Sequence, residues 1–255
     1  MSAIAGVLHG STDLLHEGFG AYSSRSVVMG GNAIVDTAAK LRQALREEAA
    51  KRLGCEPSEI FIGEQDVRAL SGRMLALSAF AGLVADGTFE SSKRTYSYGA
   101  HAAEVAVDPE TGHVALLDYA AVEDVGRIIN PATLHGQTLG AIVQGLGGVL
   151  LEELIYGPDG QPLTTGFADY LLPTSCDFPR IDVHALQLHP SPLNPLGAKG
   201  AGEGGIIPVA GVIANAVAAA LQHLAVVPNA LPLSPANVHR LICEAEARLS
   251  AAAKA

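Results

Sequence analysis

A glycine-rich loop near residue 200 combines a permissive backbone with two charged side chains. Five glycines fall between Gly197 and Gly205, and Lys199 and Glu203 stand among them. Residues 200–205, GAGEGG, formally match the G-x-G-x-x-G dinucleotide motif. The preceding PSPLNPLGAK has no strand character, however, and a carboxylate inside the loop would repel a pyrophosphate. The sequence therefore argues against a dinucleotide site here.

Glu203 is instead a candidate general base. An apolar helix is expected to start near Ile206, and the unpaired N–H groups and partial positive charge of a helix start favour an ionised carboxylate beside them. Glycines let a ligand approach the backbone closely, and an ionised carboxylate held against a ligand can accept a proton. The alternative is that Glu203 only caps the helix and that Lys199 is a solvated charge.

Residues 18–34, GFGAYSSRSVVMGGNAI, form a second candidate site. Their hydroxyl groups, their backbone N–H groups and the guanidinium of Arg25 could hold an anionic group at a helix start. An ordinary capped turn explains the same residues.

A third candidate lies in INPATLHGQTLGAIVQGLGG, where Gln137 and Gln144 are seven residues apart and share one helix face. Two amides on a glycine-lined face could hydrogen-bond a buried polar ligand. A solvated stripe of glutamines is the plain alternative.

These candidates need helices and strands to position them, and hydrophobic periodicity and turn residues predict both kinds of element. Asp108-Pro109-Glu110-Thr111-Gly112 reads as a hairpin turn, and the glycines of the helix after Pro131 predict close packing against it. The predicted helices cover residues 32–54, 73–87, 130–153, 207–224 and 234–250. The predicted strands lie within residues 58–70, 97–107, 113–126, 163–173 and 181–189. Without regular βαβ alternation, this mixture indicates an α+β fold.

Composition narrows the classes of protein. The net charge of −10 and the absence of a basic run argue against nucleic-acid binding. No membrane span or signal peptide is evident, which predicts a cytoplasmic protein. Charged residues make up only 16%, so part of the surface is expected to be covered by another chain. The three cysteines are scattered, so the sequence encodes neither a zinc site nor an iron–sulfur cluster.

Several of these segments together resemble the molybdenum hydroxylases, the family of xanthine dehydrogenase, aldehyde oxidoreductase and aerobic carbon monoxide dehydrogenase. The resemblance rests on SSRSVVMGG, SYGAHAAEVAVDPETG, DVGRIINPATLHGQTLGAIVQGLG, LLEELIYGPDGQPLTTGFADYLLPT and NPLGAKGAGEGG, which occur in the family's order. It implies that residues 1–255 are the second molybdopterin-binding domain, from the carboxy-terminal part of the molybdenum-binding subunit. The other half is then expected on a separate chain, unless this sequence is a piece of a longer one.

The resemblance also implies roles for individual residues. Glu203 matches the general base beside molybdenum, which takes a proton from a hydroxyl or water on the metal, and Gln137 matches a glutamine near the metal. The residues expected to bind the molybdopterin cofactor are Ser24, Arg25, Ser26, Val27, Gln137, Gln144, Lys199, Gly200, Ala201 and Gly202. The cofactor is expected in its cytosine dinucleotide form, with iron–sulfur clusters and FAD on partner subunits.

The implied reaction is hydroxylation of an aldehyde or N-heteroaromatic carbon by water. A non-catalytic assembly or cofactor-holding subunit is the alternative. None of the cysteines lies where carbon monoxide dehydrogenase carries the cysteine of its copper site.

Overall fold

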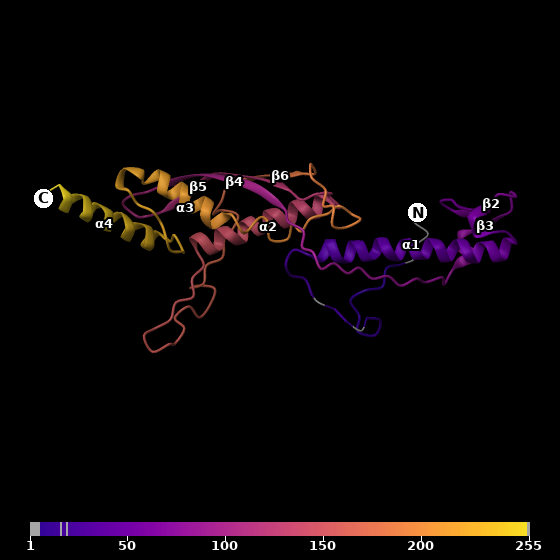
Figure 1. Cartoon of the computed structure of the whole chain (residues 1–255). Helices are drawn as coiled ribbons and strands as arrows, with labels where there is room; N and C mark the ends of the chain where they lie inside the picture. The colour runs from indigo at the N-terminus through magenta and orange to yellow at the C-terminus, as the bar shows by residue number, and fades with distance from the viewer. Residues whose placement is uncertain (1–5, 16, 19, 254–255) are drawn as a thin grey trace. The chain divides into compact units, whose positions relative to one another are not determined.

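The computed structural model describes residues 6–253 except residues 16 and 19, and the chain divides into two compact units. The first consists of Met1–Arg94 with Pro192–Leu196, and the second of Thr95–Ser191 with Gly197–Ala255. Helices and small sheets occur in both (Figure 1). The predicted α+β class is therefore confirmed.

The first unit is built on the long helix α1, Ser26–Leu53. Gly54 ends the helix in the left-handed conformation, with φ of 67°, and donates its N–H to Ala50 O. A short antiparallel sheet in the order β1-β2-β3 follows. Its strands are Ile60–Ile62, Asp66–Ala69 and Met74–Ala76, and 3-10 turns cover Pro57–Glu59 and Leu77–Phe80. The end of α1 packs with β1 and β2 around a small core that includes Leu53, Ile60 and Val67.

Two sequence predictions for this unit were inaccurate. Helix α1 begins at Ser26, six residues before the predicted start. Residues 73–87 were predicted as a helix, but they form β3 and a 3-10 turn instead. In β3, Leu75 pairs with Val67 of β2. Pairing with β2 thus overrides the helix propensity of the alanines and leucines in this segment.

The second unit has a sheet in the order β4-β5-β6. Strands β4, Tyr98–Val107, and β5, Val114–Asp124, form the predicted antiparallel hairpin, and β6, Ile181–Leu186, runs parallel to β5. Its helices are α2, Pro131–Leu150; α3, Val209–Ala220; and α4, Pro235–Ala252; a 3-10 turn covers Gln222–Leu224. No strand forms within residues 163–173, so that predicted strand was wrong.

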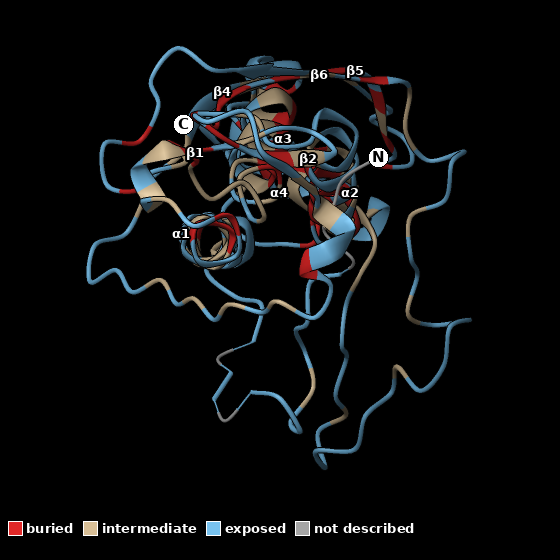
Figure 2. Cartoon of the chain, turned by 90° about the vertical axis from the view of Figure 1, so that its right-hand side faces the viewer, coloured by how far each residue is buried: buried red, intermediate tan, exposed pale blue. Residues whose placement is uncertain are grey.

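The core of this unit joins β5, α2, α3 and α4. Its fully buried members include Tyr119, Ile142, Ile213 and Val238. In Figure 2 the buried residues gather in the helices and in β5, whereas the long loops are exposed. The sheet and helices of the second unit thus form its packed core, and the loops lie outside this core.

The glycines of α2 fall into two groups. An added Cβ on Gly145 would lie 2.7 Å from Val209 Cγ2, so α2 and α3 pack closely here, as predicted. Gly136 and Gly140 face open space within the described structure. Glycine is therefore needed for packing at only part of this helix.

Candidate functional site

The glycine loop is attached by backbone hydrogen bonds to the chain that leaves β5. Gly126 and Ala198 form an antiparallel bridge. Lys199 N donates to Val125 O at 2.9 Å, and Arg127 N donates to Gly197 O at 2.9 Å. The start of the loop is therefore hydrogen-bonded to the chain that continues from the sheet.

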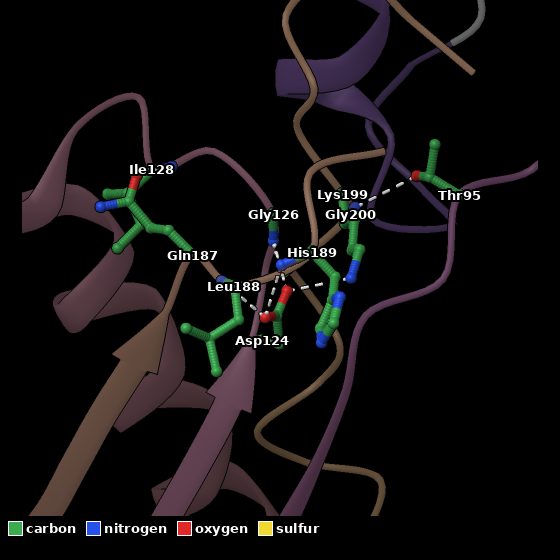
Figure 3. A network of polar contacts seen from close by, with 9 residues as sticks. All are labelled: Thr95, Asp124, Gly126, Ile128, Gln187, Leu188, His189, Lys199 and Gly200. Atoms are coloured by element: carbon green, nitrogen blue, oxygen red, sulfur yellow. Dashed lines mark hydrogen bonds and ion pairs between the residues drawn. The ribbon is translucent and has the colours of Figure 1, made fainter. Parts of the chain in front are cut away.

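Asp124, the last residue of β5, is the centre of a buried polar network (Figure 3). Its Oδ1 accepts from Gly126 N at 3.0 Å and from Lys199 Nζ at 2.9 Å. Its Oδ2 accepts from Leu188 N at 2.9 Å and from His189 N at 3.1 Å. One carboxylate thus joins the ends of β5 and β6 to the glycine loop.

The ammonium of Lys199 faces inward. Its side chain is 8% exposed and that of Asp124 is 2% exposed, and Nζ also lies 4.3 Å from the centre of the Tyr98 ring. Burial by itself raises the pKa of Asp124, but the hydrogen bonds from Lys199 and the three backbone N–H groups outweigh it. They lower that pKa from 3.8 to about 2. The alternative that Lys199 is a solvated charge is therefore wrong. Its assignment to the cofactor stays a prediction.

Helix α2 lies close to the loop on both sides of Glu203. Gln137 Nε2 donates to Gly202 O at 3.2 Å. A Cβ on Gly205 would lie 2.5 Å from Thr138 O, so only glycine allows this approach. Glu203 itself is exposed. The backbone around the candidate base is fixed while its side chain remains accessible.

The turn that contains Glu203 differs from the predicted helix start. Residues 202–208 form turns, in which Ile206 N and Ile207 N donate to Glu203 O at 3.3 Å each, and α3 begins only at Val209. The proline at 208 occupies the position just before the helix. Glu203 is therefore in a turn ahead of α3 and not in its first turn.

The remaining loop and helix candidates are distributed along this unit. Gly200 N donates to Thr95 Oγ1 at 3.3 Å, and the half-buried Ala201 follows it. Gln144 is exposed on α2, seven residues after Gln137, and makes no side-chain hydrogen bond within the described residues. The structure therefore brings Gln137 to the glycine loop and leaves the role of Gln144 a prediction.

The candidates at residues 24–27 belong to the first unit. Ser24 has a positive φ of 54°, Arg25 is the residue before α1, and Ser26 and Val27 begin the helix. Arg25 Nη1 lies 3.3 Å from Tyr22 Oη, and its guanidinium stacks 5.0 Å from the Tyr22 ring centre. A helix start is thus present at these residues, and their binding of the cofactor stays a prediction.

Sequence reasoning missed the buried carboxylates of Glu123 and Asp124, and it missed His101, the partner of Glu123. The signal was the pair of acidic residues in AVEDVG, at the end of an apolar strand. Acidic side chains are rarely buried unless they are paired. Two successive acidic residues at the end of an apolar strand therefore indicate that at least one of them is buried and paired with another side chain.

The side chains around the glycine loop are hydrogen-bonding groups. No group of three His, Cys, Asp or Glu side chains among the described residues could hold a metal ion. Around the loop stand an amide at Gln137 and a carboxylate at Glu203, both hydrogen-bonding groups. Beside Gln137 the helix face is open at Gly136 and Gly140. These residues fit a polar cofactor held by hydrogen bonds.

Comparison with known proteins agrees with this chemistry. The model of the molybdopterin cofactor-binding domain matches residues 4–179. The chain belongs to the molybdopterin-binding domains of the molybdenum hydroxylases. Among the relatives of this molybdopterin-binding domain is the gamma subunit of the 6-hydroxypseudooxynicotine dehydrogenase complex of Paenarthrobacter nicotinovorans. It is 35% identical over 91% of this chain and 31% of its own length.

A second relative from the same organism is the nicotine 6-hydroxylase large subunit, 32% identical over 88% of this chain and 29% of its own. Among solved structures, quinoline 2-oxidoreductase from Pseudomonas putida 86 matches with a TM-score of 0.78 and 36% identity. That match covers 89% of this chain and 31% of the other. The chain therefore spans about a third of the length of the proteins that it matches.

Within the described part of the chain, no helix is both long and apolar enough to cross a membrane.

Proposed function

We propose that this chain supplies the general base of a molybdenum hydroxylase that oxidises an aldehyde or N-heteroaromatic carbon with water. The observation that carries the proposal is the position of α2 on either side of the exposed Glu203: Gln137 hydrogen-bonds to Gly202, and the backbone of Thr138 closely approaches Gly205. A base must be held in place and still reach the proton that it abstracts. Two named relatives, nicotine 6-hydroxylase and quinoline 2-oxidoreductase, support an N-heteroaromatic substrate.

In the proposed reaction, a carboxylate oxygen of Glu203 accepts a proton from the attacking oxygen. Such proton transfer by a positioned side chain contributes roughly 10²–10⁴-fold to the rate. Gln137 fixes the carbonyl that precedes Glu203, and the Asp124–Lys199 pair fixes the start of the loop. When bound, the molybdenum cofactor supplies the oxidising centre that accepts the two electrons lost by the substrate.

The proposed cofactor is molybdopterin in its cytosine dinucleotide form, and residues 24–27 and 199–202 are proposed to contact it. Electrons must then leave the site. The cysteines Cys55, Cys176 and Cys243 are far apart in sequence and offer no cluster motif. We therefore assign the iron–sulfur clusters, the FAD and the other molybdenum-binding half to the rest of the complex.

The test replaces Glu203 with glutamine in the assembled complex. We expect turnover of quinoline, nicotine or benzaldehyde, measured with a dye acceptor, to fall at least 100-fold, while the content of molybdenum and pterin stays normal. The matched control is Glu246→Gln, on the exposed face of α4, which should leave turnover unchanged. Near-normal turnover of Glu203→Gln refutes the catalytic assignment, and a complex that never turns over any of the three substrates favours a non-catalytic role.

A further inference from the structure

A buried chain of hydrogen-bonding side chains lies within the second unit, apart from the Asp124 network. His101 Nδ1 lies 2.8 Å from Tyr119 Oη, and His101 Nε2 lies 3.2 Å from Glu123 Oε1. The side chains of His101 and Glu123 are 1% and 6% exposed. Tyr119 is completely buried.

The three side chains form one consistent donor–acceptor sequence. Burial and the negative charge of Glu123 raise the pKa of Tyr119, so its hydroxyl keeps a proton to donate to His101 Nδ1. His101 Nε2–H can then donate to Glu123 Oε1. The second carboxylate oxygen, Glu123 Oε2, is buried and has no hydrogen-bond partner among the described residues.

That oxygen lies against the glycine loop. A Cβ built on Gly204 would lie 2.6 Å from Glu123 Oε2, 3.0 Å from its Cδ and 3.1 Å from its Oε1. These are the three atoms nearest to that Cβ, and all belong to one side chain. The space beneath Gly204 is therefore occupied by Glu123.

A buried oxygen without a hydrogen-bond partner destabilises the fold, so this position of the Glu123 carboxyl group is expected to bring a compensating benefit. We infer that Glu123 is a positioning residue. Its carboxyl group, fixed by His101, supports the loop at Gly204 and thereby sets the position of the adjacent Glu203. The inference rests on the proposed role of Glu203 as base.

The support is firm because the carboxyl group cannot move aside freely. A carboxylate at the end of a flexible side chain ordinarily yields to an added methyl group. Here it is buried, and a displacement breaks the hydrogen bond to His101. The loop must then rise with the added methyl group, and a displacement of about 1 Å near a reacting group can cost roughly 100-fold in rate.

The test is a double-mutant cycle of Gly204→Ala and Glu123→Ala in the assembled complex. Gly204→Ala should lower kcat by roughly 100-fold with little change in KM, because a misplaced base weakens only the transition state. Glu123→Ala leaves room for the new methyl group. In that background, Gly204→Ala should cost less than about threefold.

Readouts other than turnover accompany the cycle. Thermal unfolding of the full chain should show the same coupling, with Gly204→Ala lowering Tm only when Glu123 is present. The control is Gly211→Ala in α3, where an added Cβ meets nothing within 4 Å. Glu123→Gln keeps the shape of the side chain and should retain kcat within about threefold. If Gly204→Ala fails to assemble, recovery of assembly in the double variant tests the same contact.

Several results overturn the inference. The first is that Gly204→Ala is as active as Gly211→Ala. The second is that Gly204→Ala and Glu123→Ala affect kcat and Tm independently of each other. The third is that Glu123→Gln is as slow as Glu123→Ala. Glu203→Gln, assayed in the same complex, separates this failure from failure of the proposed function. If Glu203→Gln abolishes turnover while Gly204→Ala has no effect, only the positioning role of Glu123 is refuted. If Glu203→Gln is active, the proposed function itself is refuted.

Discussion

Replacing Asp124 with asparagine tests how firmly the glycine loop is anchored. The carboxylate accepts four hydrogen bonds, three from backbone N–H groups and one from Lys199. Asparagine has one accepting oxygen, and its NH₂ group would face donors. Lys199, whose side chain is 8% exposed, would lose its counter-charge. Removal of one partner from a buried ion pair typically costs roughly 3–5 kcal/mol.

The pKa of Asp124 gives a second, smaller estimate of how much its carboxylate contributes to stability. Its shift from 3.8 to about 2 is nearly two units, or roughly 2 kcal/mol of stability for the ionised form. Because the folded-state pKa is lowered, this contribution is complete above about pH 4 and is lost as the pH falls toward 2. The stability difference between the wild-type chain and Asp124→Asn should therefore narrow over that range.

The assay is hydrogen exchange of the β5 amides in the full chain, because it reports the opening of the second unit specifically. We expect Asp124→Asn to lower the protection of these amides by 3–5 kcal/mol near pH 7. At acidic pH, urea unfolding replaces exchange. Asp182→Asn on β6 is the matched control, since its pair with Arg180 is largely exposed and should matter by less than about 1 kcal/mol.

The reasoning fails if Asp124→Asn lies within about 1 kcal/mol of the wild type, or if their difference does not change between pH 4 and pH 2. The double variant Asp124→Asn/Lys199→Met adds a check. It leaves no uncompensated buried charge, so it should be less destabilised than the sum of the two single variants.

Two further predictions concern α2. Gly145→Ala should destabilise the chain by at least about 1–3 kcal/mol, because its Cβ would press on Val209, whereas Gly140→Ala faces open space and should add up to about 1 kcal/mol to stability. Thermal unfolding of both variants decides this, and equal effects would contradict the packing account. Asn130→Ala removes the cap that accepts from Ala132 N and Thr133 N and should cost about 0.5–2 kcal/mol; an unchanged Tm would show that the cap is dispensable.

Local signals were enough to predict the elements whose sequence and packing agree. The hairpin follows from its alternating pattern and the turn at residues 108–112, and α1 ends where Gly54 predicts. Helix α4 begins at Pro235, one residue after the predicted start at residue 234. At these places the turn or cap chemistry lies within a few residues of the element it controls.

The elements that were mispredicted depend on distant partners. Residues 73–87 favour a helix by propensity, yet β2 pairs with Leu75 and its neighbours. Residues 163–173 include aromatic and leucine side chains typical of a strand, but no strand in the described structure pairs with them. Such outcomes are decided by contacts far along the chain, which a local pattern does not contain.

The candidate site shows the same division. Glu203 and Gln137 could be singled out from their motifs, because each stands beside glycines. The groups that hold the loop could not, since Asp124 meets Lys199 across 75 residues and His101 meets Glu123 only through strand pairing.

Three supports therefore converge on one short loop, two from β5 and one from α2. Asp124 holds its beginning through Lys199, Gln137 of α2 holds the carbonyl before Glu203, and Glu123 of β5 fills the space beneath the residue after it. These supports act on Lys199, Gly202 and Gly204. The backbone of the loop is therefore fixed at several points while the Glu203 side chain is exposed. Glycine is needed at Gly205 because the backbone oxygen of Thr138 approaches too closely for a Cβ, and our inference extends this need to Gly204, which faces Glu123. The glycines thus allow neighbouring groups to hold the backbone that carries the Glu203 carboxylate. We therefore expect this loop to be rigid rather than flexible.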